Sequence, residues 1–276
     1  MFSLDKHIIT GEKFQYMCEL YVGETDNNFL YNPTIGINNK NRLFKDINEN
    51  FDNPRIIYCY TYLLYNLLEK LHYFNNPFIL ISGNSDENIT ENDKYLEIAN
   101  HDKIIIWYTQ NLSFYHNKVK PLPIGIANSQ WPYGNINELS NIINNLPEKT
   151  NNIYFNFCIN TNREKRNDCY DKLNKYLDFL PTIDPIDNLK RLATYKFCIC
   201  PEGYGLDTYR IWECYYLKVV PIVLNNTFIQ LMKKEYDIPL IILNDWIEIK
   251  NIKLEDYNLY KFDYMPIVNL INKLKL

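Results

Sequence analysis

Residues 195–224 constrain the fold of this chain more than any other segment, because they read as strand, turn, helix and strand. An apolar run at 197–200 ends at a proline, as expected of a buried strand. Gly203 and Gly205 lie in the turn that follows, a helix is predicted after them, and residues 219–224 form the next apolar run. Strands that alternate with helices predict an α/β protein with parallel sheets and right-handed crossovers.

The rest of the chain repeats this alternation. Its 276 residues suit one large domain or two smaller ones. A polar linker ends near residue 150, where we place the boundary between an N-terminal domain, 1–150, and a C-terminal domain, 151–276. Residues 1–50 read as polar and irregular apart from one short strand. The expected strands are 15–22, 55–60, 78–82, 103–108, a strand with its exit loop over 120–128, and then 152–159, 197–200, 219–224 and 240–243. The expected helices include 63–74, 91–100, 168–177, 187–194, 228–234 and 265–276.

The start of the helix after Gly205 predicts an anion site. Free backbone N–H groups at a helix start favour negative charge, and glycines let a phosphate approach closely. Arg210 and Glu213 are three residues apart and share a helix face. A guanidinium suits a phosphate and a carboxylate suits the paired hydroxyls of a ribose, so the pair suggests a sugar nucleotide. The alternative interpretation is a solvated salt bridge beside an ordinary turn.

Other residues of this unit have more than one candidate role. Asp207 and Thr208 are candidates both for capping the helix and for binding this sugar nucleotide. Glu202 is expected to contact the sugar or the turn backbone. The spacing Gly203-x-Gly205-x-x-Thr208 also approximates a dinucleotide fingerprint. The third glycine is missing, and residues 223–226 lack the acid which that motif requires, so the sequence disfavours hydride transfer.

Polar residues also follow other predicted strands. Ligands of open α/β sheets bind beyond the carboxyl ends of the strands, although each of these residues is also an ordinary turn residue. Arg163 and Arg166 begin a helix after residues 152–159, where they read equally well as a second phosphate-holding turn or as solvated charges. The strand-end residues expected to bind a sugar acceptor are Asn84, Ser85, Gln110, Asn111 and Asn128, and Asp86 lies among them in the sequence.

Residues 200–213, followed by 220–223, resemble the donor-site block of exostosin-like glycosyltransferases, and residues 236–246 resemble its continuation. The resemblance is close only over this part of the chain. It implies two Rossmann-like domains that face a central cleft, the glycosyltransferase-B architecture, with a C-terminal helix that packs back on the first domain. Gly83 stands where many relatives of this kind carry a histidine.

The resemblance also implies transfer of a sugar from a UDP- or GDP-linked donor to a glycan or other hydroxyl acceptor, as a hexosyl- or pentosyltransferase. The alternative is a protein of the same fold that binds a sugar nucleotide or glycan without catalysis. A regulator that uses only the fold, and binds no nucleoside diphosphate, is a further alternative.

The sequence favours a metal-independent reaction without a cofactor. No Asp-x-Asp follows a strand, so Arg210, Arg166 and the helix start are expected to neutralise the diphosphate. Direct displacement inverts the anomeric carbon and needs a base for the acceptor hydroxyl. Asp86 is the expected base, and Glu87, His101 and His116 are the alternatives.

Composition narrows the partners and the compartment. With 46% hydrophobic residues and a net charge of −4, the chain is expected to be globular and to bind no nucleic acid. Seven cysteines without a close Cys-x-x-Cys pair indicate free thiols in a reducing compartment. Cys198 and Cys200 alternate along a strand, which favours packing over a zinc site. No secretion signal or membrane-spanning run is evident, so we expect a soluble cytoplasmic protein.

Overall fold

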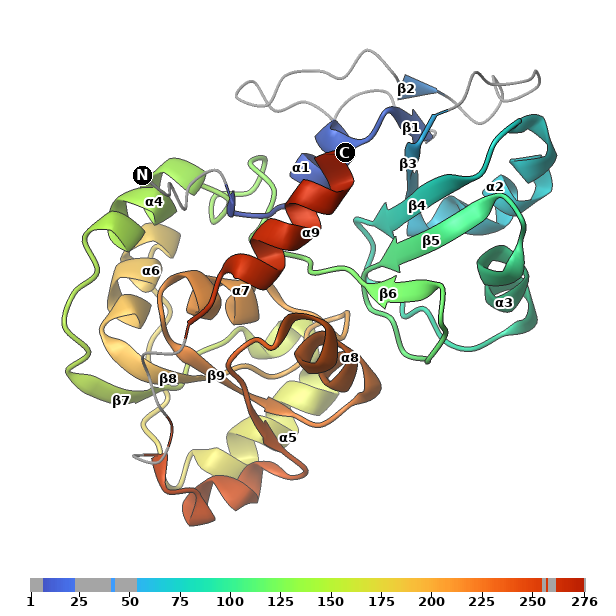
Figure 1. Ribbon diagram of the computed structural model, residues 1–276. Coiled ribbons are helices and arrows are strands. Elements are labelled where there is room, and N and C mark those ends of the chain that lie inside the picture. Colours follow the sequence, from blue (N-terminus) through green and yellow to red (C-terminus); the bar gives the residue numbers. More distant parts are fainter. Residues whose placement is uncertain (1–6, 23–40, 43–53, 255–256, 258–261, 276) are drawn as a thin grey trace. The chain divides into compact units, whose positions relative to one another are not determined.

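The computed structural model describes residues 7–22, 41–42, 54–254, 257 and 262–275 (Figure 1). Most of the segment predicted to be irregular, 1–50, lies outside these residues. The chain divides into two compact units, which we call the N-terminal unit (Ile9–Ile124 with Asn269–Leu276) and the C-terminal unit (Met1–Ile8 with Gly125–Val268). The chain therefore passes between units upstream of residue 150. Residues before 150 belong to the C-terminal unit because helix α4 (Ile136–Asn144) packs against helix α6 (Pro185–Ala193) of that unit.

The N-terminal unit contains a six-stranded sheet in the order β2-β1-β3-β4-β5-β6, and every neighbouring pair is parallel. Its strands are β1 (Leu20–Val22), β2 (Asn41–Arg42), β3 (Ile56–Tyr60), β4 (Phe78–Gly83), β5 (Ile104–Thr109) and β6 (Val119–Pro121). The strand predicted at 15–22 is wrong over its first part. Helix α1 (Gly11–Met17) occupies that part, because Thr10 caps it by accepting the Lys13 N–H at 3.1 Å.

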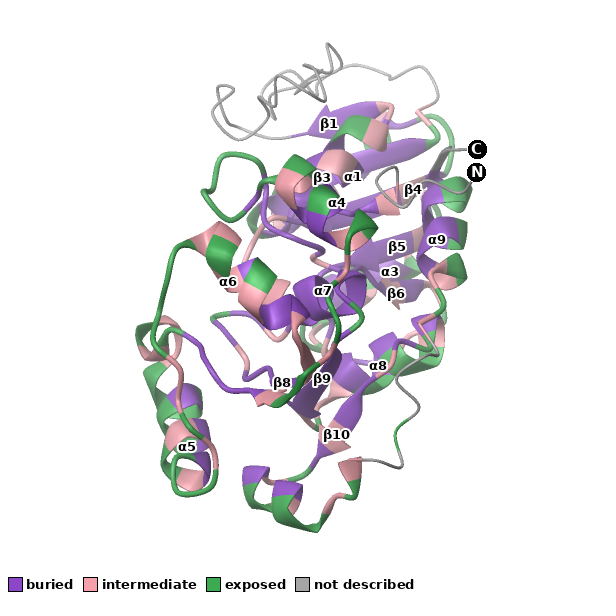
Figure 2. Cartoon of the chain, turned by 90° about the vertical axis from the view of Figure 1, so that its left-hand side faces the viewer, coloured by how far each residue is buried: buried purple, intermediate pink, exposed green. Residues whose placement is uncertain are grey.

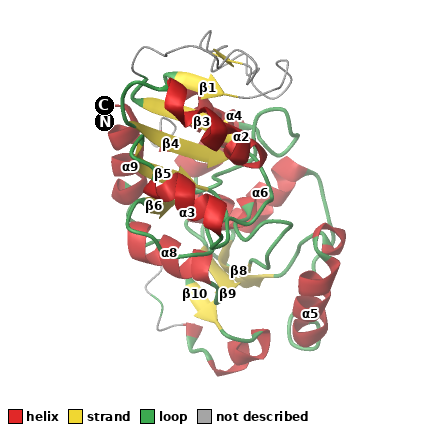
Figure 3. Ribbon diagram, turned by 90° about the vertical axis from the view of Figure 1, so that its right-hand side faces the viewer, coloured by secondary structure: helices red, strands yellow, loops and turns green. Residues whose placement is uncertain are grey.

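Helices cover the sheet of the N-terminal unit as the alternating pattern predicts. Figure 3 shows α2 and α3 in front of the strands, and the two helices contact β3 and β5, respectively. The helix predicted at 63–74 consists of three consecutive helical pieces. The helical segments between β3 and β5 are η3 (Thr61–Leu63), α2 (Leu64–Lys70), η4 (Leu71–Tyr73) and α3 (Asp93–Asn100).

The C-terminal unit contains a four-stranded parallel sheet in the order β10-β9-β8-β7. Its strands are β7 (Asn151–Tyr154), β8 (Tyr195–Ile199), β9 (Val220–Leu224) and β10 (Ile241–Leu243). Its other helical segments are η5 (Ile159–Thr161), α5 (Arg163–Leu173), α7 (Tyr209–Tyr216), α8 (Thr227–Tyr236) and η6 (Trp246–Asn251). The final helix, α9 (Met265–Lys275), divides between the units at Val268 and Asn269. Two parallel α/β sheets confirm the predicted fold class at this level.

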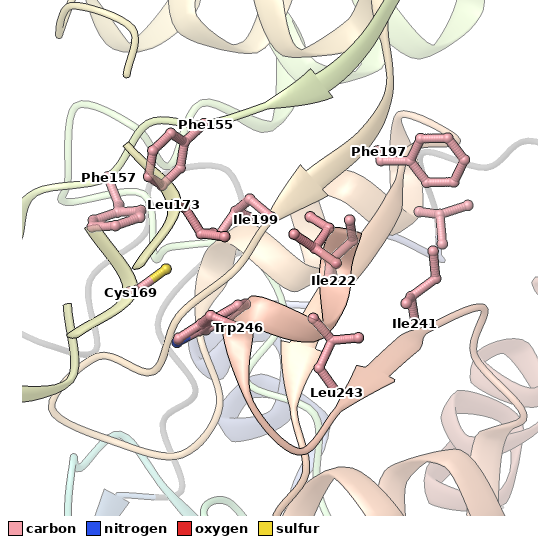
Figure 4. Packing of buried hydrophobic residues seen from close by; sticks show 12 residues of the cluster. Phe155, Phe157, Cys169, Leu173, Phe197, Ile199, Ile222, Ile241, Leu243 and Trp246 are labelled. Carbon is pink, nitrogen blue, oxygen red and sulfur yellow. The ribbon is translucent and has the colours of Figure 1, made fainter. Parts of the chain in front are cut away.

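The core of the C-terminal unit lies between its sheet and helix α5. Figure 4 shows Phe155, Ile199, Ile222 and Trp246 among the side chains that fill it. Helix α7 is buried along most of its length (Figure 2), and its residues from Ile211 to Tyr216 are all buried. A helix so enclosed holds its first turn in a fixed place relative to strand β8. Among the described residues, no helix is long and apolar enough to cross a bilayer.

Candidate functional site

The turn between β8 and α7 is held mainly by its own side chains. Thr208 occupies the N-cap position of α7 with an extended backbone, but its side chain makes no capping hydrogen bond. The Asp207 carboxylate instead accepts the Thr208 N–H at 2.9 Å and the indole N–H of Trp212 at 2.9 and 3.0 Å. Trp212 is fully buried, so Asp207 anchors the turn to the core. Of the two candidate donor-binding residues, Asp207 therefore has its carboxylate occupied by the protein.

Arg210 and Glu213 form an ion pair with Nε and Oε2 2.9 Å apart, and their side chains are only 21% and 10% exposed. Arg210 Nη1 also donates to the Asn156 carbonyl at 3.0 Å, and its guanidinium lies 5.4 Å from the ring centre of Tyr154. Burial alone would lower the pKa of Arg210, but Glu213 and nearby thiols raise it above its ordinary value. The pair is thus partly enclosed and rigid, unlike the solvated salt bridge considered as the alternative.

Arg166 joins this site from helix α5 and is only 9% exposed. Its Nε donates to the Glu202 carbonyl at 2.9 Å and its Nη1 to the Cys158 carbonyl at 2.7 Å. Burial lowers the pKa of Arg166, and the neighbouring charge of Arg210 contributes to that direction. Within the described part of the chain, no carboxylate pairs with Arg166. The structure therefore places an uncompensated buried cation close to a second guanidinium.

Both arginines keep one nitrogen unused by the protein. Nε and Nη1 of each bind a carbonyl or carboxylate, whereas Nη2 of each has no hydrogen-bond partner among the described residues. A Cβ at Gly203 would lie 3.5 Å from Nη2 of Arg166, so the missing side chain leaves that nitrogen accessible from the turn. Arg163 differs, because it is exposed and binds Asn160 Oδ1 at 3.0 Å, away from this arrangement.

Two asparagines that sequence reasoning missed brace the turn. Asn162 donates to the Gly203 carbonyl at 2.7 Å, and Asn226 donates to Glu202 Oε1 at 2.7 Å. Each is also the N-cap of the helix that follows a neighbouring strand. An asparagine at the start of a helix that follows a strand could have been recognised in the sequence. Because the ends of parallel strands meet at one edge of the sheet, such a residue is expected near this turn. Glu202 thus contacts a neighbouring loop, and Gly205 is buried within the turn.

An exposed aromatic pair lies beside the same helix start. The rings of Trp131 and Tyr133 are nearly parallel, at 6° with centroids 6.1 Å apart, and Tyr133 lies 6.1 Å from Tyr209. Trp131 is 45% exposed and Tyr133 is 39% exposed. Burial and the nearby Glu213 carboxylate raise the pKa of Tyr133. Sequence reasoning missed this pair, because nothing local links it to α7.

The loop that presents this aromatic pair is closed by backbone contacts. Trp131 N–H donates to the Asn128 carbonyl at 3.0 Å, and Gly134 N–H donates to the Trp131 carbonyl at 2.9 Å. A side chain at Gly134 would meet the Asn128 carbonyl at 2.0 Å, so this close approach requires glycine. Asn128 lies in the C-terminal unit, whereas the other residues predicted on the acceptor side lie in the N-terminal unit.

The structure brings the other four predicted acceptor-side residues together at the ends of β4 and β5. Asn84 N–H donates to Gln110 Oε1 at 2.8 Å, and Asn111 Nδ2 donates to the Ser85 carbonyl at 3.0 Å. Asn84 and Asn111 both adopt positive φ angles, 54° and 52°. A Cβ at Gly83 would lie 2.6 Å from the Gln110 side chain, so Gln110 fills the space that a larger residue at 83 would need.

Asp86 stands apart from the alternative bases. Its side chain is exposed at the surface, and partial desolvation raises the pKa of its carboxyl. Glu87 accepts the Tyr95 hydroxyl at 2.7 Å, His101 accepts the Lys103 N–H at 3.1 Å, and His116 accepts the Lys118 N–H at 3.2 Å. Those three are therefore engaged in local structure, while the Asp86 carboxylate has no hydrogen-bond partner among the described residues.

A cluster of thiols lies behind Arg210. Cys198, Cys200 and Cys214 are buried, and their sulfur atoms all lie within 4.8 Å of one another. Burial raises the pKa of Cys198, but hydrogen bonds from the other two thiols and the charge of Arg210 outweigh burial and hold it well below its ordinary value. The sequence placed Cys198 and Cys200 on one strand face. Cys214 was missed, because only the packing of α7 brings it there.

Comparison with known proteins leaves the family open. No protein-family model matches this chain. No curated protein matches it either.

Proposed function

We propose that this protein is a glycosyltransferase of glycosyltransferase-B architecture that moves a sugar from a UDP- or GDP-linked donor to a hydroxyl acceptor. The C-terminal unit is the proposed donor-binding part. The proposal extends the resemblance of residues 200–213 to exostosin-like enzymes, and the geometry of that segment supports it independently.

One observation carries the proposal: Arg166 is a nearly buried cation that no carboxylate neutralises within the described residues. A buried unpaired charge is costly, and a second guanidinium nearby adds to the cost. A bound anion removes it. With Nη2 of Arg166 and of Arg210 unused, each arginine offers one nitrogen to the oxygens of a diphosphate.

The surroundings fit the rest of a nucleotide sugar. Glu213, held by Arg210, supplies a carboxylate for ribose hydroxyls, and the exposed rings of Trp131 and Tyr133 supply a surface on which a base stacks. Base–aromatic stacking contributes about 1–3 kcal/mol. Gly203 gives the phosphate room beside Arg166.

The proposed chemistry is direct displacement. The acceptor oxygen bonds to the anomeric carbon while the bond from that carbon to the donor phosphate oxygen breaks, and its electron pair leaves on the diphosphate. Asp86 takes the acceptor proton, a role that its raised pKa and unoccupied carboxylate suit. The arginines stabilise the negative charge that builds up on the leaving group, so the proposal needs no divalent ion.

Tryptophan fluorescence provides the test. Trp107, Trp212 and Trp246 are at most 1% exposed, whereas Trp131 is 45% exposed. Titration with UDP or GDP is expected to quench Trp131, and pyrophosphate is expected to bind without the same quenching. In Trp131→Phe the nucleotide signal should disappear while calorimetry still detects binding. If neither the nucleotides nor pyrophosphate bind, the proposed function fails.

The second candidate is a binding protein of the same fold without catalysis. It shares the unused arginine nitrogens, so nucleotide titration does not separate it from an enzyme. Hydrolysis of the donor in the absence of an acceptor separates the two candidates, because only an enzyme releases the nucleotide. Slow release of UDP or GDP from a sugar nucleotide, abolished in Arg210→Ala, supports the enzyme, and its absence with every donor tested favours the binding protein.

A further inference from the structure

The strongest unassigned feature is the cluster of Cys198, Cys200 and Cys214, which strand β8 and helix α7 bring together. Cys198 lies in β8 and Cys200 directly follows the strand, so their side chains, two residues apart in extended chain, point to the same side. Cys214 lies on α7, which packs beside them, and its sulfur is 4.0 Å from that of Cys200. None of the three has a role in the proposed glycosyl transfer.

We propose that these three cysteines bind a soft, thiophilic metal ion as thiolates. Metal–sulfur bonds of zinc are about 2.3 Å long, so three sulfurs that share one ion lie about 4 Å apart. The observed separations, 4.0 Å for one pair and no more than 4.8 Å for any, need only a small contraction. An all-sulfur ligand set selects ions such as Zn²⁺ or Cu⁺ over Mg²⁺ or Ca²⁺.

Charge favours a divalent ion at this place. Three thiolates carry −3, a divalent ion adds +2, and the Arg210 guanidinium, whose Nη1 lies 4.0 Å from the Cys198 sulfur, adds +1. Glu213, which pairs with Arg210, brings the sum to −1, and a divalent ion therefore leaves less buried negative charge than a monovalent one. No histidine, aspartate, glutamate or further cysteine of the described residues joins the three as a fourth ligand. Three ligands suit Cu⁺ better than Zn²⁺, which usually takes four. The two ions are therefore tested separately.

The ion would link the residue after strand β8 to helix α7, the two elements on either side of the turn at residues 201–208. Cys200 is the last residue before Pro201 and Glu202, and Cys214 follows Glu213 on α7. A bond through the metal would therefore fix β8 to α7 directly behind Arg210. This role is structural, and it does not depend on nucleotide binding.

The experiment uses the full chain, purified with a reductant, stripped of metal and titrated separately with Zn²⁺, Cu⁺ and Cd²⁺. We expect one tightly bound ion per chain in native mass spectrometry and a thiolate-to-metal charge-transfer band with Cd²⁺. Cys198→Ser, Cys200→Ser and Cys214→Ser should each weaken binding by more than about 100-fold, because losing a ligand costs more than losing an outer-shell partner.

Two cysteines of the same unit are matched controls: Cys158 is exposed and Cys169 is buried outside the cluster. Cys158→Ser and Cys169→Ala should bind the ion as the unaltered chain does. Because a cluster variant can also fail by misfolding, the thermal midpoint is measured with and without metal. The metal should raise it in the unaltered chain and the controls, and not in cluster variants whose circular dichroism spectrum is native.

Three results would overturn the proposal. One is a chain that binds no ion although labelling after unfolding shows all three thiols reduced. Another is Cys214→Ser that binds metal as tightly as the controls. The third is a Cys200–Cys214 disulfide in the protein purified without reductant, with no metal bound after reduction.

Discussion

The strand ends of the two units carry polar residues of different kinds, neutral amides in the N-terminal unit and guanidinium groups in the C-terminal unit. At the ends of β4 and β5, the residues Asn84, Ser85, Gln110 and Asn111 bind one another. At the end of β8 the protein satisfies only part of each guanidinium, and Arg166 and Arg210 retain unused donors. The first arrangement closes the loops but leaves the buried Gln110 Nε2 without a hydrogen-bond partner in the described part of the chain. The second leaves a nearly buried cation without a carboxylate among the described residues, so we place the proposed ligand in the C-terminal unit.

Asp86 is the ionisable residue among these strand-end residues, and its exposed carboxylate has no hydrogen-bond partner among the described residues. In the proposed function the N-terminal unit contributes one reactive group, and the C-terminal unit contributes several binding groups. Variants that affect turnover and binding separately test this division of roles between the units.

The largest expected effect is on turnover in Asp86→Asn. The change keeps size and polarity but removes the base, so transfer should fall by about 10²–10⁴. Donor affinity, measured by calorimetry, should hardly change. The unaltered enzyme should also lose activity as the pH falls through the pKa of Asp86, which burial places above its ordinary value. Unchanged turnover in Asp86→Asn would remove the N-terminal unit from the chemistry as assigned here.

The next effect is on donor binding in Arg210→Ala. A charged hydrogen bond contributes about 1.5–3 kcal/mol, which corresponds to about 10- to 150-fold in affinity. The measurement is a UDP and GDP titration. Arg163→Ala is the matched control, because this exposed arginine binds only Asn160 and should leave the affinity unchanged. Equal affinities in both variants would end the donor-site assignment.

A smaller effect is expected in Gly203→Ala. The added methyl would stand 3.5 Å from Arg166 Nη2 and 3.7 Å from Thr161 and Thr208, which are ordinary contact distances, so the thermal midpoint should change little. The methyl would occupy the space through which an anion reaches that nitrogen. Affinity for pyrophosphate should fall about 5- to 10-fold, the equivalent of about one hydrogen bond. Binding as tight as in the unaltered chain would show that the ligand lies elsewhere.

The smallest expected effect is that of a chelator on turnover. Since guanidinium groups are proposed to neutralise the diphosphate, brief treatment with EDTA should leave sugar transfer unchanged. The buried thiol cluster is followed in the same samples by metal analysis, so that loss of a structural ion is recognised. Activity that disappears in EDTA and returns with Mg²⁺ or Mn²⁺, with the thiol site unchanged, would contradict the metal-independent mechanism.

The sequence by itself determined the elements and the local geometry. Apolar runs and helical periodicity predicted parallel strands β3 to β10 and most helices, because burial of a sheet face and of a helix face leaves those patterns. It also placed Arg210 and Glu213 on one face of α7. Spacing within a helix is fixed by helix geometry, so no tertiary information was needed.

Only the tertiary structure decided which distant residues join that pair. Arg166 reaches Glu202 across 36 positions of the chain, and Cys214 reaches Cys200 across 14. The aromatic pair Trp131 and Tyr133 lies beside Tyr209 for the same reason. Such contacts depend on how helices pack against the sheet, and a local pattern carries no record of that packing. From the sequence, Arg166 could be either a phosphate ligand or a solvated surface charge. Its side chain is buried in the fold, which excludes the interpretation as a solvated surface charge.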